Sequence, residues 1–228
     1  MENFKNSLIK DKKLGIVCND AGGSEIISSW LLSKNNKVNF HLTGPAIDIF
    51  KKRFPIKKNL NLSELINNSD VIITGTSLKS MQEINAIKQS KLKNKKVISF
   101  IDHWVNYEKR FIRSRIKILP NIIIAHDSKS YLLLKKKFPK KIKIYFIKNA
   151  YFKLVLDRYK NITKNKKKNK FVFFSSNNDV SISNLSDINC LKNTIRFIKE
   201  KFNKKNDRTN IILRCHPSEN KKKYDKIK

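Results

Sequence analysis

VISFIDHWVNYEKRF, residues 97–111, is the stretch that most directly indicates the fold of this chain. Its apolar beginning, Val97–Ile101, is typical of a strand that is buried on both faces of a parallel sheet. Polar and aromatic residues follow at once: Asp102, His103, Trp104, Asn106 and Tyr107. Because ligands of open α/β sheets bind at the carboxyl ends of the strands, we expect a functional site here. The structural alternative is that Trp104 and Tyr107 pack under a loop while Asp102 caps a helix.

Strand and helix patterns alternate along the chain on both sides of this stretch. Short apolar runs predict further strands over residues 14–18, 37–42, 71–73, 121–125 and 142–147. Helical spacing predicts helices over residues 25–33, 47–53, 62–67, 79–91 and 129–137. This alternation predicts a Rossmann-like α/β domain over residues 14–148, in which right-handed crossovers connect a doubly wound parallel sheet.

The first predicted strand ends in NDAGGS, residues 19–24. Gly22 and Gly23 would let the backbone approach a ligand closely, and the start of the next helix would offer free N–H groups to an anion or a sugar hydroxyl. Asp20 is a further candidate for substrate binding at this turn. The spacing is not G-x-G-x-x-G, so it does not support a dinucleotide site. The alternative is a tight turn with Ser24 as the helix cap.

Residues 149–169 differ from the rest in being polar and basic, with no periodicity from Lys160 onward, and we interpret them as a linker. Strands over 170–174 and 210–213 and a helix over 188–202 then predict the start of a second α/β lobe, residues 170–228. A full lobe needs on the order of 100 further residues. We therefore expect this lobe to be incomplete.

The last predicted strand ends in RCHPSE, residues 214–219. Arg214, His216 and Glu219 would place a fixed cation, an imidazole and a carboxylate within reach of one ligand phosphate, with Ser218 beside them. Pro217 stiffens the turn that presents them. The alternative is a structural histidine whose ring bonds to the backbone.

The formal net charge of +33 suggests an anionic partner. The excess consists of 43 Lys against 8 Arg, spread along the whole chain. Readers of phosphates and bases rely on the bidentate guanidinium, so this composition disfavours nucleic acid. Attraction to an anionic membrane surface fits lysine better.

Three scattered cysteines, Cys18, Cys190 and Cys215, indicate reduced thiols in the cytoplasm. We find no signal-peptide pattern at the start and no apolar run of the roughly 20 residues that a membrane span needs. Cys215 and His216 lack a second ligand pair, and no Asp-x-Asp motif is present, so we expect neither metal nor cofactor. The expected location is cytoplasmic, with peripheral contact at the inner membrane face.

Two α/β lobes, a Gly-Gly first loop and an Arg-x-His-Pro segment together resemble the GT-B glycosyltransferases. The segment 102–107, with Arg110-Phe111, resembles that of GT-B-like proteins linked to bacterial surface polysaccharide. His216-Pro217 is similar to the His-Pro motif of polysialyltransferases and CDP-glycerol glycerophosphotransferases. In such enzymes the second lobe continues well beyond this motif and supplies much of the donor site.

The resemblance implies transfer of a sugar or polyol phosphate from a nucleotide donor to a polysaccharide or lipid-linked acceptor. Asp102 or His103 would be the base or the group that orients the acceptor. The resemblance assigns the substrate to Gly22, Gly23, Asp20, Asn106 and Tyr107, and the donor phosphates to Arg214, His216, Ser218 and Glu219. Two alternatives stay open: a nucleotide-sugar epimerase of related fold, and a non-enzymatic basic module that binds anionic lipid or polymer.

Overall fold

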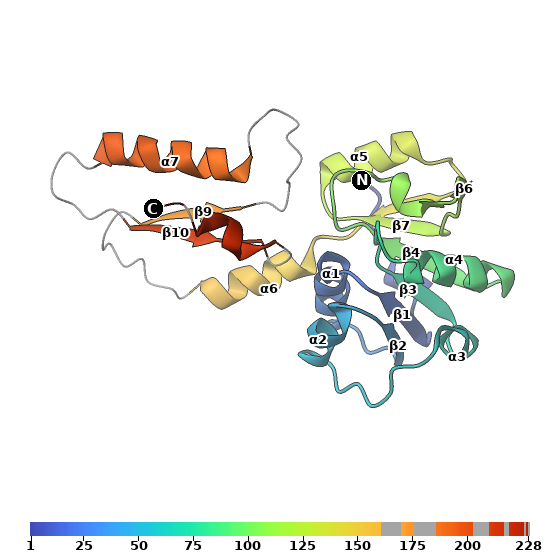
Figure 1. Cartoon of the computed structure of the whole chain (residues 1–228). Helices are drawn as coiled ribbons and strands as arrows, with labels where there is room; N and C mark the ends of the chain where they lie inside the picture. The colour runs from blue at the N-terminus through green and yellow to red at the C-terminus, as the bar shows by residue number, and fades with distance from the viewer. Residues whose placement is uncertain (161–169, 176–185, 203–209, 217–218, 226, 228) are drawn as a thin grey trace. The chain divides into compact units, whose positions relative to one another are not determined.

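A computed structural model describes residues 1–160, 170–175, 186–202, 210–216, 219–225 and 227. The chain divides into two compact units, Met1–Asn161 and Ile162–Lys228 (Figure 1). Each unit is described by itself below. Among the described helices, none has the length and apolar character needed to cross a bilayer.

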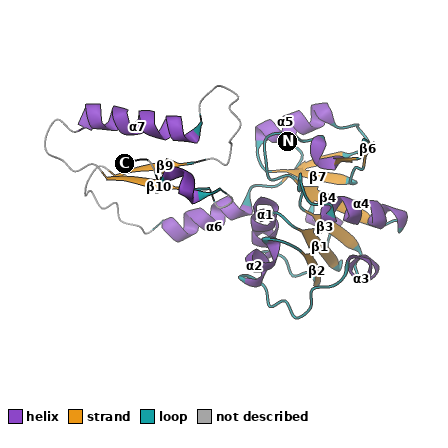
Figure 2. Ribbon diagram, viewed as in Figure 1, coloured by secondary structure: helices purple, strands orange, loops and turns teal. Residues whose placement is uncertain are grey.

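Unit 1 is built on a six-stranded parallel sheet with the strand order β2-β1-β3-β4-β7-β8 (Figure 2). The strands are β1 (Leu14–Cys18), β2 (Val38–Leu42), β3 (Val71–Thr74), β4 (Lys96–Phe100), β7 (Ile122–Ala125) and β8 (Lys143–Phe146). Every neighbouring pair in this sheet is parallel. The prediction of a doubly wound, Rossmann-like α/β fold is confirmed.

Helices cover both faces of this sheet and so create two cores. α1 (Ala21–Leu31), α2 (Ala46–Lys51) and α6 (Ala150–Tyr159) contribute to one core. α3 (Leu62–Asn67), α4 (Gln82–Leu92) and α5 (Ser128–Lys137) contribute to the other. Strand side chains alternate between the two cores, because successive residues of a strand point to opposite faces. In β4, for example, Ile98 and Phe100 lie in the first core and Val97 in the second, which explains the unbroken apolar run.

The strand order reverses at β1, which pairs with β2 on one side and β3 on the other. In doubly wound sheets, the crevice outside the carboxyl ends of the strands at such a switch point is where ligands bind. The turn after β1 and the loop after β3 therefore flank the expected site. β4 lies next to β3, which brings residue 102 to the same edge.

Several elements of unit 1 were not predicted, and the first of them is the 3-10 turn η1 (Asn6–Leu8). A small antiparallel hairpin, β5 (Ile112–Arg113) and β6 (Ile116–Lys117), follows the 3-10 turn η2 (Lys109–Phe111). The interpretation of residues 149–169 as a linker is wrong at its beginning, where α6 forms. Asn149 caps this helix by accepting N–H bonds from the two residues after Ala150, and Ala150 and Tyr151 pack against the first core. Residues 161–169 lie outside the described part of the chain.

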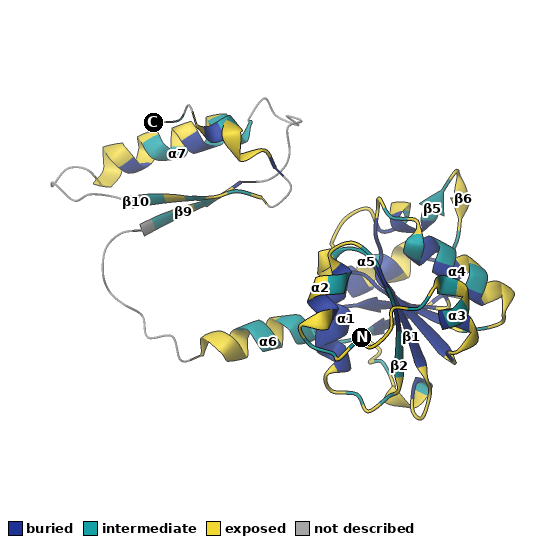
Figure 3. Cartoon of the chain, turned by 60° about the horizontal axis from the view of Figure 1, so that its bottom comes forward, coloured by how far each residue is buried: buried dark blue, intermediate teal, exposed yellow. Residues whose placement is uncertain are grey.

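Unit 2 contains a two-stranded parallel sheet, β9 (Lys170–Phe174) and β10 (Asn210–Arg214), with α7 (Asp187–Phe202) and the 3-10 turn η3 (Lys221–Tyr224). α7 covers one face of the sheet, where the rings of Phe171 and Phe202 lie 5.1 Å apart. Among the described elements of unit 2, no helix packs on the other face beneath the strands (Figure 3). Phe174, whose side chain alternates to that face, is 72% exposed. The two strands and the helix that the sequence predicts after the linker are present.

Candidate functional site

Asp102, directly after β4, lies against the first turn of α1. Its Oδ1 accepts a hydrogen bond from Arg110 Nη1 at 2.9 Å, and the side chains are 14% and 5% exposed respectively. A Cβ added to Gly22 would overlap Asp102 Oδ2, so only glycine leaves room for this carboxylate. This contact places Asp102 and Gly22 at the same edge of the sheet.

Burial raises the pKa of Asp102 above its ordinary value, although the Arg110 guanidinium acts in the opposite direction. A carboxylate with a raised pKa is a stronger base, and general bases work best when their pKa approaches the operating pH. Since Arg110 occupies Oδ1, the oxygen that can accept a proton from a substrate is Oδ2.

Arg110 joins the loops that follow β3 and β4. Besides bonding to Asp102, its Nη1 donates to the Thr76 carbonyl at 2.5 Å. Arg113 supports the same loop from the hairpin, because its Nη2 donates to the carbonyls of Ser77 and Ser80 at 2.8 and 3.1 Å. The sequence indicated Arg110 only through the resemblance, and nothing in its pattern indicated these backbone partners.

Gly22 and Gly23 do not form a loop, as the sequence suggested, but belong to the first turn of α1, which begins at Ala21. Asp20, not Ser24, occupies the N-cap position. A Cβ on Gly23 would lie 3.3 Å from the Gly75 Cα, so the two backbones approach each other closely at the switch point.

A buried carboxyl group that the sequence analysis missed supports the β1 exit. Glu83, at 3% exposure, accepts the Asn19 backbone N–H through Oε1 at 2.9 Å. Its Oε2 is buried and accepts no hydrogen bond from the residues that the structure describes. Burial raises the pKa of Glu83 to about 7, and the Asp20 charge adds to the effect. The nearby Cys18 thiol is also buried, which raises its pKa.

A small cavity of about 80 Å³ adjoins Asp102 between the carboxyl ends of β4 and β7. Ligand pockets typically measure about 300–1,000 Å³, so this cavity could hold only a small part of a substrate. Its polar and aromatic lining consists of Asp102, His103, Trp104, His126, Asp127, Ser130, Asn149 and Phe152.

His126 is one of the two histidines in this lining. Its Nδ1 lies 2.9 Å from the Ile147 carbonyl, and its Nε2 is buried without a hydrogen-bond partner among the described residues. Burial lowers the pKa of His126 to about 4, so the ring is neutral near pH 7. Asp127 caps α5 by accepting the Ser130 backbone N–H, and it also accepts a hydrogen bond from Trp104 Nε1 at 3.0 Å.

The remaining predicted residues of the 97–111 stretch differ in accessibility. His103 is exposed and lines the cavity. Tyr107 is only 3% exposed, and its hydroxyl bonds to Ser130 Oγ at 3.1 Å. The packing alternative therefore describes Tyr107 better than substrate contact does. Asn106 is exposed and has a left-handed backbone, with φ at 59°, a conformation that Asn tolerates well.

In unit 2, hydrogen bonds connect the residues that follow β9 with those that follow β10. His216 donates its backbone N–H to Ser175 Oγ at 3.1 Å, and that hydroxyl donates to Glu219 Oε1 at 2.8 Å. Lys223 Nζ lies 3.7 Å from the same oxygen. Glu219 is 8% exposed and acts as a structural acceptor, and its negative charge would repel a phosphate. The Arg214 and His216 side chains are exposed, whereas Ser218 and Pro217 lie outside the described residues.

A search of protein-family models and of curated protein sequences found no match to this chain. The class of the protein therefore follows from its own architecture: a doubly wound α/β protein whose switch point carries a buried acid–guanidinium pair. Within the described ranges, no group of three or more His, Cys, Asp or Glu side chains is arranged to hold a metal ion.

Proposed function

We propose that this protein is glycosyltransferase-like and transfers a sugar or polyol phosphate from a nucleotide donor to a hydroxyl group of a polysaccharide or lipid-linked acceptor. The observation that carries the proposal is the Asp102 carboxylate. It lies at the carboxyl edge of the sheet, beside the switch point, and its pKa is raised by burial. Arg110 and Gly22 fix its position.

In this reaction Asp102 Oδ2 takes the proton of the acceptor hydroxyl as that oxygen bonds to the transferred group. The bond between that group and the leaving phosphate oxygen breaks, and the nucleotide leaves with the electron pair. His103, which lines the same cavity, would orient the acceptor. In unit 2, the assignment of the donor phosphates to Arg214 and His216 stays a prediction: both side chains are exposed, and a guanidinium is a fixed cation that can stabilise charge on a phosphate.

The same proposal places the protein in the cytoplasm, at the inner face of the membrane where a lipid-linked acceptor would lie. A non-enzymatic module that binds an anionic lipid or polymer is the second candidate, because the chain carries a net charge of +33. Binding that falls steeply with salt, without turnover of any donor, would identify that module.

The test starts with thermal shifts for UDP-glucose, UDP-N-acetylglucosamine, CMP-N-acetylneuraminate and CDP-glycerol. A donor present at 100 times its dissociation constant adds about 2.7 kcal/mol to the stability. Release of free nucleotide from the donor that binds is then measured with glycan and lipid-linked acceptors. A free sugar isomer formed without an acceptor would identify an epimerase instead.

Asp102→Asn keeps the shape of the side chain but removes the base. We expect nucleotide release to fall by about 10²- to 10⁴-fold while the thermal shift with the donor is retained. His103→Ala, its neighbour in the cavity, is the matched variant and should lower turnover less. Unchanged turnover in Asp102→Asn, or no shift and no release with any donor, contradicts the proposal.

A further inference from the structure

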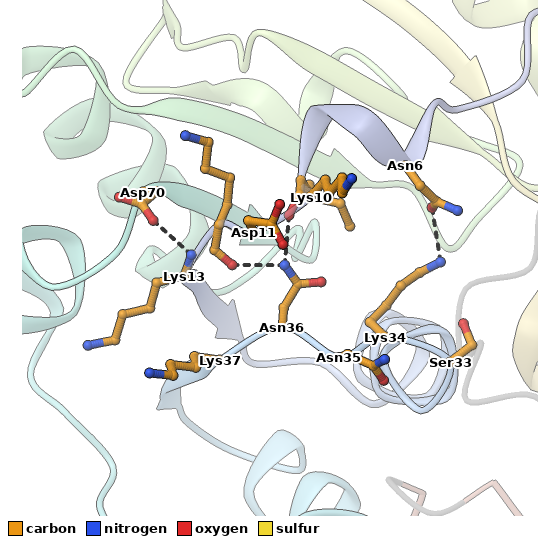
Figure 4. Close-up of a pocket in the computed structure, with 12 residues that line it drawn as sticks. Asn6, Lys10, Asp11, Lys13, Ser33, Lys34, Asn35, Asn36, Lys37 and Asp70 are labelled. Atoms are coloured by element: carbon orange, nitrogen blue, oxygen red, sulfur yellow. Dashed lines mark hydrogen bonds between the residues drawn. The ribbon is translucent and has the colours of Figure 1, made fainter.

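A basic cavity lies at the amino edge of the unit 1 sheet, where β1, β2 and β3 begin. It measures about 630 Å³, and its lysines come from the turn before β1 and from the segment between α1 and β2 (Figure 4). Five lysines line the cavity: Lys10, Lys12, Lys13, Lys34 and Lys37. Two aspartates, Asp11 and Asp70, are also in the lining. Asp70 accepts the backbone N–H of Lys13 at 2.8 Å. Within the described part of the chain, no carboxylate forms an ion pair with these five ammonium groups. With five lysines against two aspartates, the lining of the cavity has a net positive charge.

A second, more apolar cavity of about 590 Å³ adjoins the first. It lies between the N-terminal segment, α1, the end of β8 and the start of α6. Its apolar lining residues are Phe4, Trp30, Leu32, Phe146, Ile147, Ala150 and Leu154. Three further charged residues, Lys148, Lys153 and Asp157, also line it. Asn6, Ser33 and Lys34 line both cavities, so the basic and the apolar spaces meet at these three residues.

Lys34 marks the boundary between the two spaces. Its Nζ donates to Asn6 Oδ1 at 3.0 Å and stands 5.2 Å from the centre of the Trp30 ring. Burial lowers its pKa. An anion close to a partly desolvated ammonium group that has only neutral partners stabilises its charge. Leu32, two residues earlier, is 50% exposed and presents apolar surface to the second cavity.

We propose that the two cavities together bind one molecule of a phosphate-headed anionic lipid. Its phosphate occupies the lysine-lined cavity, where lysines act as point charges on phosphate. Its hydrocarbon chain occupies the apolar cavity, and both volumes fall within the usual range for ligand pockets of about 300–1,000 Å³. A free phosphate would leave the apolar cavity unused, and a neutral hydrocarbon would leave the lysines unused. The inference is independent of the proposed transfer reaction, because it requires neither a nucleotide donor nor Asp102. It gives the second candidate function, binding of an anionic lipid, a specific site in unit 1.

The ligand chemistry is tested with the full chain and dihexanoyl phosphatidic acid, used below its micelle concentration in calorimetry. Glycerol 3-phosphate has the same head without the chains, and dihexanoylglycerol has the chains without the phosphate. We expect phosphatidic acid to bind at least about tenfold more tightly than either control, since only it uses both cavities. Equal affinity for glycerol 3-phosphate overturns the proposal. Binding to phosphatidylglycerol vesicles without binding of the short-chain lipid also overturns it, because a flat membrane surface would then be the partner.

Matched variants locate the site. The triple variant Lys10→Ala, Lys13→Ala, Lys37→Ala should weaken phosphatidic acid binding by about tenfold or more. Its control removes the same charge from exposed lysines elsewhere in unit 1, by Lys136→Ala, Lys140→Ala and Lys141→Ala. We expect the control to retain binding within about twofold, because distant charges are screened at ordinary salt concentrations. An equal loss in both variants would mean a general effect of net charge and overturns the proposal.

The apolar cavity is tested separately by Leu32→Ser. Its control is Leu132→Ser on α5, where the leucine is 58% exposed. Because both leucines are largely exposed, neither variant should unfold the chain, and thermal unfolding verifies this. Leu32→Ser should weaken phosphatidic acid binding by about threefold or more and leave glycerol 3-phosphate binding unchanged. Equal phosphatidic acid binding by the two leucine variants overturns the assignment of the hydrocarbon chain.

Discussion

The sheets of the two units differ in how many of their faces are covered. In unit 1 helices cover both faces, and all residues of β4 except Lys96 are buried. In unit 2 α7 covers one face, and Val172 and Phe174 on β9 are 48% and 72% exposed. Yet both strands begin with lysine and are otherwise mainly apolar, with the sequences KVISF in β4 and KFVFF in β9. The composition of a strand thus predicts a sheet but not the number of layers that pack on it.

The difference predicts unequal stability. When both faces of a strand are covered, the apolar side chains on each face are buried, and burial stabilises the fold by roughly 25 cal/mol per Å². A two-stranded sheet covered by one helix has little core by comparison. We therefore expect unit 1 to hold most of the folding free energy of the chain.

The largest expected effect comes from removing one aromatic ring from each sheet. Phe100 on β4 is fully buried, with its ring 5.1 Å from that of Trp30, so Phe100→Ala should lower the unfolding free energy of unit 1 by about 3–5 kcal/mol. Phe174→Ala, on the open face of β9, should change stability by no more than about 0.5 kcal/mol. Urea denaturation measures both. A large loss with Phe174→Ala would show that another surface covers this face.

The second effect concerns buried carboxyl groups with opposite pKa shifts in the two units. Glu83 in unit 1 has a pKa raised to about 7, so its stabilising contribution is fully present below about pH 4.5 and is lost as the pH rises through 7. The loss amounts to at most about 3 kcal/mol, at 1.36 kcal/mol per pKa unit. Burial acts to raise the pKa of Glu219 in unit 2, but the hydrogen bond from Ser175 and the charge of Lys223 together lower it, so its contribution is lost as the pH falls.

Glu83→Gln isolates this contribution. The variant is needed because His126 changes the stability with pH in the opposite direction. Its pKa is lowered to about 4, so its stabilising contribution is lost as the pH falls below about 6.5. The unfolding free energy of the parent minus that of Glu83→Gln should decrease between about pH 4.5 and pH 8. Urea titrations at a series of pH values measure this difference. A difference that is constant with pH would mean that Glu83 titrates normally.

The third and smallest effect is the difference in hydrogen exchange between the two sheets. Amides of Ile98–Phe100 should exchange at least about a hundredfold more slowly than those of Phe171–Phe174, because core strands open only by global unfolding. Hydrogen exchange followed by mass spectrometry compares the two peptides in one experiment. Equal protection would mean that unit 2 is as stable as unit 1 and that the contrast in coverage has no energetic consequence.

Much of the fold of unit 1 could be predicted from the sequence, because strand and helix periodicities are local. The predicted bounds of β1 and α3 agree with the structure, and the other strands of the main sheet differ by one residue at either end. The strand order β2-β1-β3 could not be predicted, because it depends on which side each crossover returns to. The hairpin was missed because its strands have only two residues each. α6 was missed because it was grouped with the basic, non-periodic residues that follow it.

The candidate site was predictable only in part. Asp102 could be identified because it follows a buried strand directly. Glu83 had a weaker signal: it lies three and four residues before Ala86 and Ile87, on the buried face of α4. The role of Arg110 depends on carbonyl groups of a distant loop, which no local pattern encodes. Tyr107 was assigned to substrate because a sequence does not show whether a phenol beside a strand exit points inward or outward.

The rates at which the three cysteines react with a thiol reagent measure how often each unit opens. A thiol reacts with an aromatic disulfide reagent only as an accessible thiolate. Cys18 is buried, and its raised pKa disfavours the thiolate, so it reacts only when the switch point of unit 1 opens. Cys190 and Cys215, in unit 2, are partly accessible. The reagent should therefore modify Cys190 and Cys215 quickly and Cys18 slowly. The slow rate measures how often unit 1 opens around Cys18 and Glu83.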